Sequence, residues 1–240
     1  MEPKDRLIFP LDVPEGAQAL ELIRLLKNDV GLFKVGLELF VAQGPQFLQT
    51  VTAELGVGFF LDLKFHDIPE TMARALDALG PGIRFTTIHC EQGPELLRAT
   101  AAAGSRGVQV LGVTVLTSLD TPDLLAAGID PRYADPPRNL VLRRAELARQ
   151  AGCRGVVCSP WEVRAVKERF GPDFLAVCPG VRPAWAAVPG DDQKRVMTPA
   201  AAIREGADYL VIGRPIRQAP DPAAAARRVV AEMAAALAPA

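Results

Sequence analysis

The chain has 240 residues, 49% of them hydrophobic and 6% aromatic, which is enough for one globular domain with a sizeable core. Its 27 Lys and Arg residues balance 28 Asp and Glu residues, and the formal net charge is −1. This balance, without a local basic patch, argues against binding to nucleic acid or to an anionic membrane surface. The amino terminus lacks the apolar stretch of a signal peptide, and no segment approaches the ~20 apolar residues of a membrane span. We therefore expect a cytoplasmic protein.

Histidines and cysteines are too few, and too irregularly spaced, for the common metal sites. The chain has two histidines, and its four cysteines form no CxxC motif. These counts exclude a three-histidine site within one chain and argue against a zinc ribbon, a redox pair or a disulfide framework. His66 and His89 are better explained as structural residues, and Cys90, Cys158 and Cys178 as buried small hydrophobes. We expect no metal ion.

Eight short apolar runs recur along the chain, each followed by a stretch with helical spacing. Because the runs are almost continuously apolar, they are typical of strands covered on both faces of a parallel sheet. The predicted strands are 6–12, 32–38, 57–64, 85–90, 108–116, 155–159, 174–180 and 209–214. The predicted helices are 16–28, 38–54, 70–79, 92–103, 138–151, 160–170, 198–206 and 222–237. Eight such units in 240 residues predict an α/β fold, a (β/α)8 TIM barrel that forms a single domain over residues 1–240.

Two segments between the predicted elements are unusually long. The fifth and seventh strands are followed by the Pro/Gly-rich segments TSLDTPDLLAAGIDPRYADPP and VRPAWAAVPGDDQKR. Both come after carboxyl ends of strands, where barrel enzymes build their active sites. We expect them to be functional loops, in the second of which Trp185 either packs a lid or anchors the loop.

Polar side chains end the apolar runs. They are Asp12, Lys34, Asp62, Lys64, His89, Thr114, Ser159 and Arg214. In a barrel, all the carboxyl ends of the strands point to one face. Residues far apart in the sequence are therefore expected to converge on a single site.

Asp62 and Lys64 stand two positions apart in FFLDLK, so both side chains are expected on the same side of the strand. On an exposed strand they would form an ordinary surface ion pair. Within an apolar run, two charges are costly to bury unless they pair, which favours a functional role. Lys34, within LFKVGLE, is a second lysine in an apolar run, and Asp12, at the end of RLIFPLD, provides another carboxylate. An alternating Asp/Lys set keeps each lysine protonated, and a lysine held as an ammonium acts as a general acid.

Asp67 follows in the segment HDIPET, and Thr71 falls in the first turn of the next predicted helix. An aspartate before Ile-Pro-Glu is typical of a helix N-cap. The nearness of Asp67 to Asp62 and Lys64 also leaves a role in the site open.

A candidate phosphate site follows the last two predicted strands. Gly213 and Arg214 end the eighth strand, Arg182 follows the seventh, and Gln193 lies in GDDQKR. Barrels commonly bind phosphate with the loops after strands 7 and 8, and the guanidinium fork suits a phosphate group. A turn glycine with solvated arginines is the alternative interpretation.

These motifs together resemble the orotidine 5′-phosphate decarboxylases of the bacterial type. The resemblance runs from end to end and rests on LD (11–12), FKVGLELF (33–40), DLKFHDIPET (62–71), VTVLTS (113–118), VCPGVR (177–182), DQKRVMTP (192–199) and VIGRPI (211–216). The sequence departs from the pattern at Phe9-Pro10 and in a slightly longer segment between Arg182 and Gln193. The resemblance implies a cofactor-free barrel homodimer that converts orotidine 5′-phosphate to UMP and carbon dioxide, the last step of de novo UMP synthesis.

The resemblance also implies roles for single residues. It makes Lys64 the proton donor to C6 of the pyrimidine, places Asp62 beside the substrate carboxylate, and lets Asp67 and Thr71 reach into the partner subunit's site. The implied substrate-binding residues are Asp12 and Lys34 for the ribose hydroxyls, Thr117 near the pyrimidine, and Arg182, Gln193, Gly213 and Arg214 for the phosphate.

Two other functions remain open. A magnesium-dependent sugar-phosphate decarboxylase or aldolase of a related barrel group can place the same D-x-K pair beside its metal ion, and EDTA would inhibit it. A non-catalytic barrel that binds a phosphate ligand would keep the phosphate loops. It would have little reason to keep two lysines and three aspartates in apolar surroundings.

Overall fold

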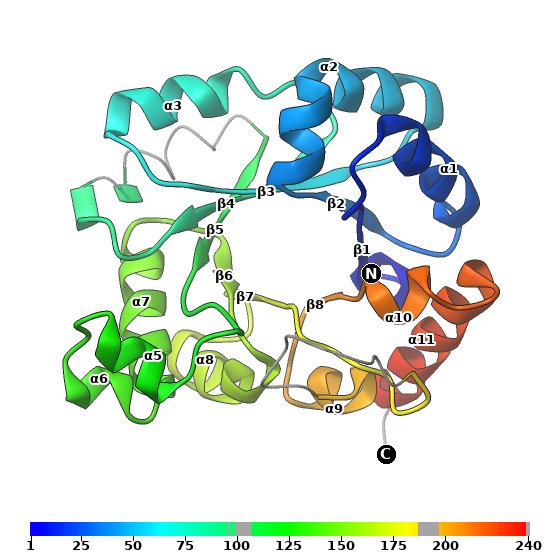
Figure 1. The fold of residues 1–240 in the computed structure, drawn as a ribbon. Helices are drawn as coiled ribbons and strands as arrows, with labels where there is room; N and C mark the ends of the chain where they lie inside the picture. Colours follow the sequence, from blue (N-terminus) through cyan, green and yellow to red (C-terminus); the bar gives the residue numbers. More distant parts are fainter. Residues whose placement is uncertain (96, 99–106, 187–196, 239–240) are drawn as a thin grey trace.

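Eight parallel strands close into a barrel. The computed structural model describes residues 1–95, 97–98, 107–186 and 197–238 of the chain. The strands follow one another around the barrel in sequence order, and β8 pairs with β1 to close it (Figure 1). The strands are β1 (Leu7–Pro10), β2 (Leu32–Val35), β3 (Phe59–Phe65), β4 (Ile83–His89), β5 (Gln109–Val113), β6 (Gly155–Val157), β7 (Leu175–Cys178) and β8 (Tyr209–Val211). The predicted (β/α)8 barrel is confirmed.

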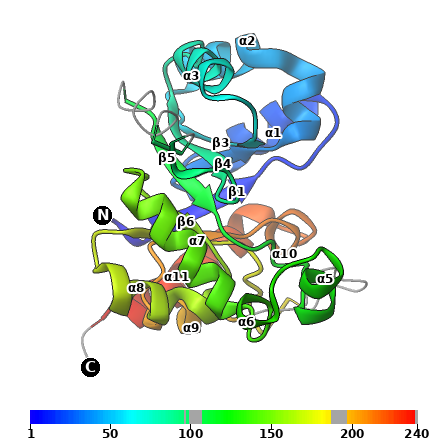
Figure 2. The same cartoon turned by 90° about the vertical axis from the view of Figure 1, so that its left-hand side faces the viewer.

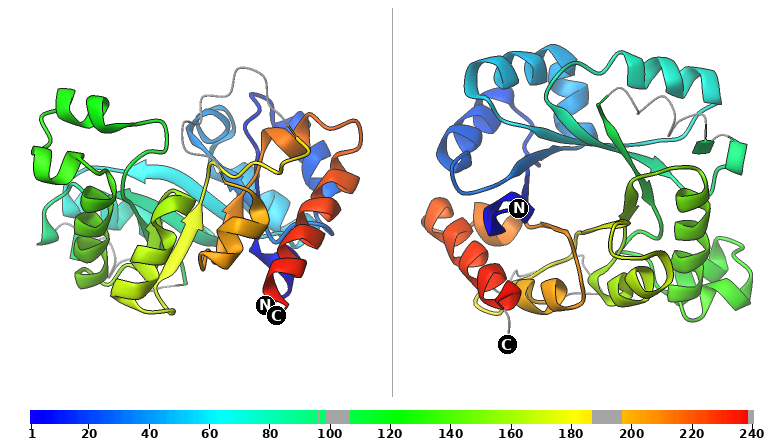
Figure 3. Two further views of the ribbon diagram at one scale, coloured as in Figure 1. Left: turned by 90° about the horizontal axis from the view of Figure 1, so that it is seen from below. Right: turned by 180° about the vertical axis from the view of Figure 1, so that it is seen from behind.

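Helices surround the barrel. The longer ones are α1 (Gly16–Leu26), α2 (Leu37–Leu55), α3 (Pro69–Asp77), α7 (Arg138–Gln150), α8 (Val163–Phe170) and α11 (Pro222–Leu237). The short elements are η1 (Pro3–Arg6), α5 (Thr121–Ala126), α6 (Pro131–Ala134), η3 (Pro160–Glu162), α9 (Pro199–Arg204) and α10 (Arg214–Arg217). Half of the predicted helix 92–103 falls outside the described residues. The C-terminal helix α11 packs beside η1 and α1, which closes the ring of helices (Figure 3).

The segment after β5, predicted as a loop, contains two short helices, α5 and α6 (Figure 2). Asp120 caps the first, because its side chain accepts a hydrogen bond from Asp123 N. Asp130 caps the second by accepting from Arg132 N. Each helix also has a proline in its first turn. The Pro and Asp residues that suggested a loop are therefore helix-start signals. Along the described part of the chain, no helix is long and apolar enough to cross a membrane.

Both faces of the barrel wall are buried, which explains the continuous apolar runs. One cluster of buried side chains comes from strands alone and fills the interior: Ile8, Leu32, Phe60, Phe85, Leu111, Val177, Tyr209 and Val211. Their neighbours in sequence, such as Leu7, Phe9, Phe59 and Leu61, belong to a larger cluster shared with the helices. Successive side chains thus alternate between the interior and the helical layer.

Phe85 occupies the centre of the interior cluster. Its ring meets those of Phe60 and Tyr209 edge-on, with centroids 6.1 Å and 5.1 Å away. We predict that Phe85→Ala lowers the free energy of unfolding by about 3–5 kcal/mol, because it leaves a cavity that the closed barrel cannot collapse. Leu25, half exposed on α1, provides the control, since Leu25→Ala is expected to cost less than about 1 kcal/mol. Urea denaturation of both variants checks this, and equal losses would contradict the assignment of Phe85 to the barrel core.

Candidate active site

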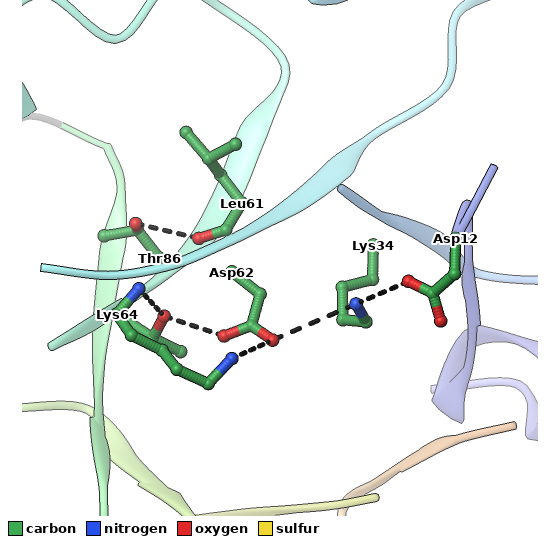
Figure 4. Close-up of polar contacts among 7 residues, drawn as sticks. Asp12, Lys34, Leu61, Asp62, Lys64 and Thr86 are labelled. Atoms are coloured by element: carbon green, nitrogen blue, oxygen red, sulfur yellow. Dashed lines mark hydrogen bonds and ion pairs between the residues drawn. The ribbon is translucent and has the colours of Figure 1, made fainter. Parts of the chain in front are cut away.

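Four charged side chains of alternating sign line up at the carboxyl ends of the first three strands (Figure 4). Lys34 Nζ on β2 donates to Oδ1 of Asp12, which follows β1, over 3.2 Å. Asp62 Oδ2 on β3 accepts from Lys64 Nζ at 2.8 Å and lies 3.9 Å from Lys34 Nζ. The structure therefore brings together Asp12, Lys34, Asp62 and Lys64, four of the residues that the sequence singled out. We call these four residues the charged array.

Asp62 is the centre of the charged array, because its carboxylate faces both ammonium groups. Only 15% of its side chain is exposed. Burial raises its pKa, but the charges of Lys34 and Lys64, with hydrogen bonds from Lys64 and Thr87, outweigh burial and bring the pKa below 3.8. The carboxylate is therefore ionised at neutral pH.

Lys64 does not continue the regular strand. Leu61 pairs with Thr86 and Phe65 pairs with Ile88, so residues 62–64 together face a single residue of β4. This bulge gives Lys64 a φ of +52°, and no other non-glycine residue in the described ranges has a positive φ. A left-handed backbone costs about 1–2 kcal/mol for a side chain like this. Strand alternation predicted that Asp62 and Lys64 lie on the same side of the strand. They do contact each other, but because of the bulge and not because of regular alternation. Bulges often redirect a side chain beside an active site.

Thr87 on β4 is a site residue that sequence reasoning missed. Its hydroxyl donates to Asp62 Oδ1 and accepts from the backbone N of Lys64, both over 2.9 Å. A threonine in a strand is ordinary, because β-branched residues favour strands. The only available signal was a pair of adjacent threonines in the apolar segment FTTIHC.

A cavity of about 280 Å³ opens beside the charged array. Lys34, Asp62 and Lys64 form its polar side, and Thr117 lies in the same wall as apolar residues from the ends of β5 and β6. Its described lining is completed by Val113, Val115, Leu116, Ser118, Val157, Cys158 and Pro179. The cavity therefore offers charged groups on one side and a mostly apolar surface on the other, as is typical of sites for small molecules.

Asp67 and Thr71 are exposed and lie outside the charged array. Asp67 Oδ1 accepts a hydrogen bond from Ile68 N over 2.6 Å. The interpretation of Asp67 as a helix N-cap was wrong, because α3 begins at Pro69 and its N-cap is Ile68, which makes no side-chain cap. The Pro in the first turn was predicted correctly. Asp67 is thus free of a capping role.

Three of the candidate phosphate residues, Arg182, Gly213 and Arg214, follow two neighbouring strands, β7 and β8. Arg182 N donates to Met197 O, next to the isolated bridge between Val181 and Met197. Gly213 precedes α10, and a Cβ there would lie 2.6 Å from the ring of Pro10 on β1. Only glycine fits at position 213, because the proline ring at position 10, part of the unusual Phe9-Pro10 sequence, lies so close. Arg214 begins α10, whereas Gln193 lies outside the described residues.

Comparison with known proteins identifies the family. A family model, the orotidine 5′-phosphate decarboxylase / HUMPS family, matches residues 5–229. The chain belongs to this family. The chain is 51% identical to the orotidine 5′-phosphate decarboxylase of Desulfosudis oleivorans, over 98% of this chain and 95% of the relative. The corresponding protein of Anaeromyxobacter dehalogenans is 50% identical, with 96% and 99% covered.

A solved structure agrees with this assignment. The crystal structure of orotidine 5′-phosphate decarboxylase from Lactobacillus acidophilus matches with a TM-score of 0.81 and 35% identity, covering 95% of this chain and 98% of that one. The resemblance that the motifs suggested is therefore confirmed at the level of the orotidine 5′-phosphate decarboxylase / HUMPS family.

The rings of His66 and His89 lie side by side near the charged array, with their centroids 5.9 Å apart. His89 Nδ1 is 3.4 Å from Glu91 Oε1, and Glu91 also pairs with Arg144 at 3.0 Å. Burial, together with the charges of His66, Lys64 and Arg144, lowers the pKa of His89 despite Glu91, so His89 is neutral at pH 7. Among the residues described, no three His, Cys, Asp or Glu side chains are grouped to hold a metal ion.

Two smaller expectations concern the cysteines and Trp185. All four cysteines are free and buried, which confirms the burial predicted for Cys90, Cys158 and Cys178. Trp185 packs against the barrel core, and the guanidinium of Arg228 lies 4.4 Å from its ring centroid. Trp185 therefore anchors its loop.

The charge on Asp62 has a measurable consequence for stability. Its pKa in the folded protein lies below 3.8, the ordinary value that it has in the unfolded chain. At a pH near or below 3.8 the unfolded chain therefore binds more protons at this position than the folded protein does, and the free energy of unfolding decreases as the pH falls. We predict that the unfolding free energy of the wild type, minus that of Asp62→Asn, decreases as pH is lowered from about 5 toward 3. Urea denaturation at several pH values measures this difference. A difference that is flat, or that grows toward low pH, would contradict the ionised, paired state of Asp62.

Proposed function

We propose that this protein decarboxylates orotidine 5′-phosphate to UMP and carbon dioxide. The observation that carries the proposal is the charged array, in which two lysine ammoniums share the buried carboxylate of Asp62 beside a cavity. The relatives at about half identity, which carry the name orotidine 5′-phosphate decarboxylase, support the same substrate. The reaction is the last step of UMP synthesis.

Lys64 is the proposed catalytic acid. When the bond between C6 and the carboxylate breaks, its electron pair stays on C6 and carbon dioxide leaves. Without a cofactor to take up this charge, a fixed ammonium beside C6 must stabilise the developing anion. An N–H bond of Lys64 then breaks, the C6–H bond of UMP forms, and solvent reprotonates the amine. The contact with Asp62 at 2.8 Å supports this role, because it fixes the position of the Lys64 amine beside the cavity.

Asp62 has a second proposed role toward the substrate. Its low pKa keeps it charged at neutral pH, and the substrate's carboxylate would lie beside it. Two like charges in a partly desolvated cavity repel each other, and this repulsion is relieved as carbon dioxide leaves. Asp62 thus contributes to the reaction both directly and by holding Lys64 in position.

The remaining site residues are proposed to bind parts of the substrate far from C6. Asp12 and Lys34, which contact each other at 3.2 Å, would take the ribose hydroxyls, and Thr117 would lie near the pyrimidine. The phosphate would be held by Arg182, Gln193, Gly213 and Arg214. Binding energy from the phosphate can draw the long loops over the ring and be used for transition-state stabilisation.

We further propose a homodimer in which each active site receives Asp67 and Thr71 from the partner chain. Both residues are exposed, although they adjoin the charged array in sequence. Three large apolar side chains in the first turns of α2 or just before α3 are also exposed: Leu37 by 58%, Val41 by 80% and Ile68 by 63%. Leu37 and Val41 lie one turn apart on α2, and Ile68 directly precedes α3. An apolar surface of this kind supports burial against a second copy of the chain.

The organisation and location of the protein are part of the same proposal. The closed barrel and its continuous core support a single domain over residues 1–240. Four free, buried cysteines suit the reducing conditions of the cytoplasm.

Lys64→Ala tests the proposed reaction. We expect turnover of orotidine 5′-phosphate, followed by ultraviolet absorbance, to fall at least about 10³-fold, because both charge stabilisation and proton donation are lost. Lys27, exposed on the protein surface, provides the control, and Lys27→Ala should retain full activity. Substantial turnover by Lys64→Ala would contradict the assignment. EDTA should leave the wild type unaffected, whereas inhibition restored by magnesium would favour the metal-dependent alternative.

Mixed dimers test the shared site. We expect Lys64→Ala and Asp67→Ala each to be inactive alone. If Asp67 acts across the interface, a hybrid dimer contains one site with both defects and one site with neither. Mixing the two variants after mild dissociation should then restore up to about a quarter of wild-type activity, by the statistics of random pairing. Absence of recovery, in a mixture shown by differential tagging to contain hybrids, would count against Asp67 acting across the interface.

A further inference from the structure

Thr87 lies on β4 opposite the bulge that carries Lys64. Because Leu61 pairs with Thr86 and Phe65 with Ile88, Thr87 is the one β4 residue that faces residues 62–64. Its side chain is fully buried. The described lining of the cavity includes Asp62 and Lys64 but not Thr87, so Thr87 acts on the site through these two residues.

The direction of both hydrogen bonds at Thr87 is fixed by chemistry. The backbone N–H of Lys64 can only donate, and the carboxylate of Asp62 can only accept. The single hydrogen of the Thr87 hydroxyl must therefore point at Asp62 Oδ1, 2.9 Å away, while its lone pair receives the N–H of Lys64, also at 2.9 Å. The hydroxyl cannot be reversed without losing both bonds.

Each of these bonds controls a different part of the site. With Oδ1 of Asp62 held by Thr87, the plane of the carboxylate is set so that Oδ2 faces the Nζ atoms of Lys64 and Lys34, at 2.8 Å and 3.9 Å. The second bond gives a partner to the N–H of Lys64, which the bulge has turned away from the regular β3–β4 ladder. The left-handed backbone of Lys64 is thereby supported where it is strained.

We propose that Thr87 is a positioning residue for decarboxylation: one hydroxyl sets the rotation of the Asp62 carboxylate and the backbone from which Lys64 reaches C6. This inference rests on the proposed function. It explains why β4 has a threonine at this position, where an apolar β-branched residue would fill the same space.

Thr86 provides a matched control within the same strand. It is also fully buried, and its hydroxyl donates to the backbone carbonyl of Leu61 over 2.9 Å (Figure 4). Thr86→Val and Thr87→Val therefore remove the same group from neighbouring buried positions. Only Thr87→Val removes a contact with the charged array.

The test compares Thr87→Val, Thr87→Ser and Thr86→Val in the full chain. We expect Thr87→Val to lower kcat roughly 10- to 100-fold, because small misplacements of catalytic groups have effects of this size. The KM for orotidine 5′-phosphate and the Kd for UMP should change less than about threefold, since the groups that bind ribose and phosphate are untouched. Thr87→Ser keeps the hydroxyl and should restore kcat to within about threefold, and Thr86→Val should match the wild type.

Other outcomes overturn the inference. They are an unchanged kcat in Thr87→Val, an equal loss in Thr86→Val, or a loss in Thr87→Val that serine does not restore. If the wild type itself fails to turn over orotidine 5′-phosphate, the proposed function fails instead. A crystal structure of Thr87→Val tests the geometry separately from activity: we expect a rotated Asp62 carboxylate and a lengthened contact with Lys64 Nζ. An unchanged arrangement of Asp62 and Lys64 would refute the positioning role.

Discussion

The carboxylate of Asp62, shared between two ammonium groups at one end of the barrel, is the interaction on which the rest of the site depends. Removing a charge from water is costly, so Asp62 and Lys34 can lie this deep only because each of them faces opposite charges on both sides. Because the two lysines outweigh the effect of burial on its pKa, Asp62 stays ionised. The same arrangement holds the Lys64 amine in the wall of the cavity, within reach of a ligand there.

The barrel provides the rigidity that this arrangement requires. Phe60 and Phe85 fill the interior on the same two strands that carry Asp62 and Thr87, and the parallel register fixes β2, β3 and β4 against one another. A bulge in β3 then directs Lys64 into the site at the cost of a strained backbone. Such strain persists only where the surrounding structure determines the conformation, as the buried core does here.

Much of the fold could be predicted because its causes are local. A strand buried on both faces must be continuously apolar, so eight such runs indicated the barrel, and the charges that end them indicated its functional face. The helices α5 and α6 were missed, since the caps Asp120 and Asp130 were read as loop residues. Asp67 is the opposite case: it was interpreted as a helix N-cap, but Ile68 occupies that position. Thr87 could not be found from sequence, because its role depends on the bulge across from it, a tertiary feature without a local signature.

The central claim is that an ammonium at position 64 makes the reaction possible, and chemical replacement tests it most directly. Lys64→Cys introduces an accessible thiol into a chain whose four cysteines are all buried, so 2-bromoethylamine should modify that position selectively and rebuild an ammonium of nearly the length of lysine. The account predicts that this treatment restores decarboxylation of orotidine 5′-phosphate at least about tenfold over untreated Lys64→Cys, whereas iodoacetamide, which adds a neutral group, restores none. Equal activity after the two treatments, or no recovery with confirmed modification, would contradict it.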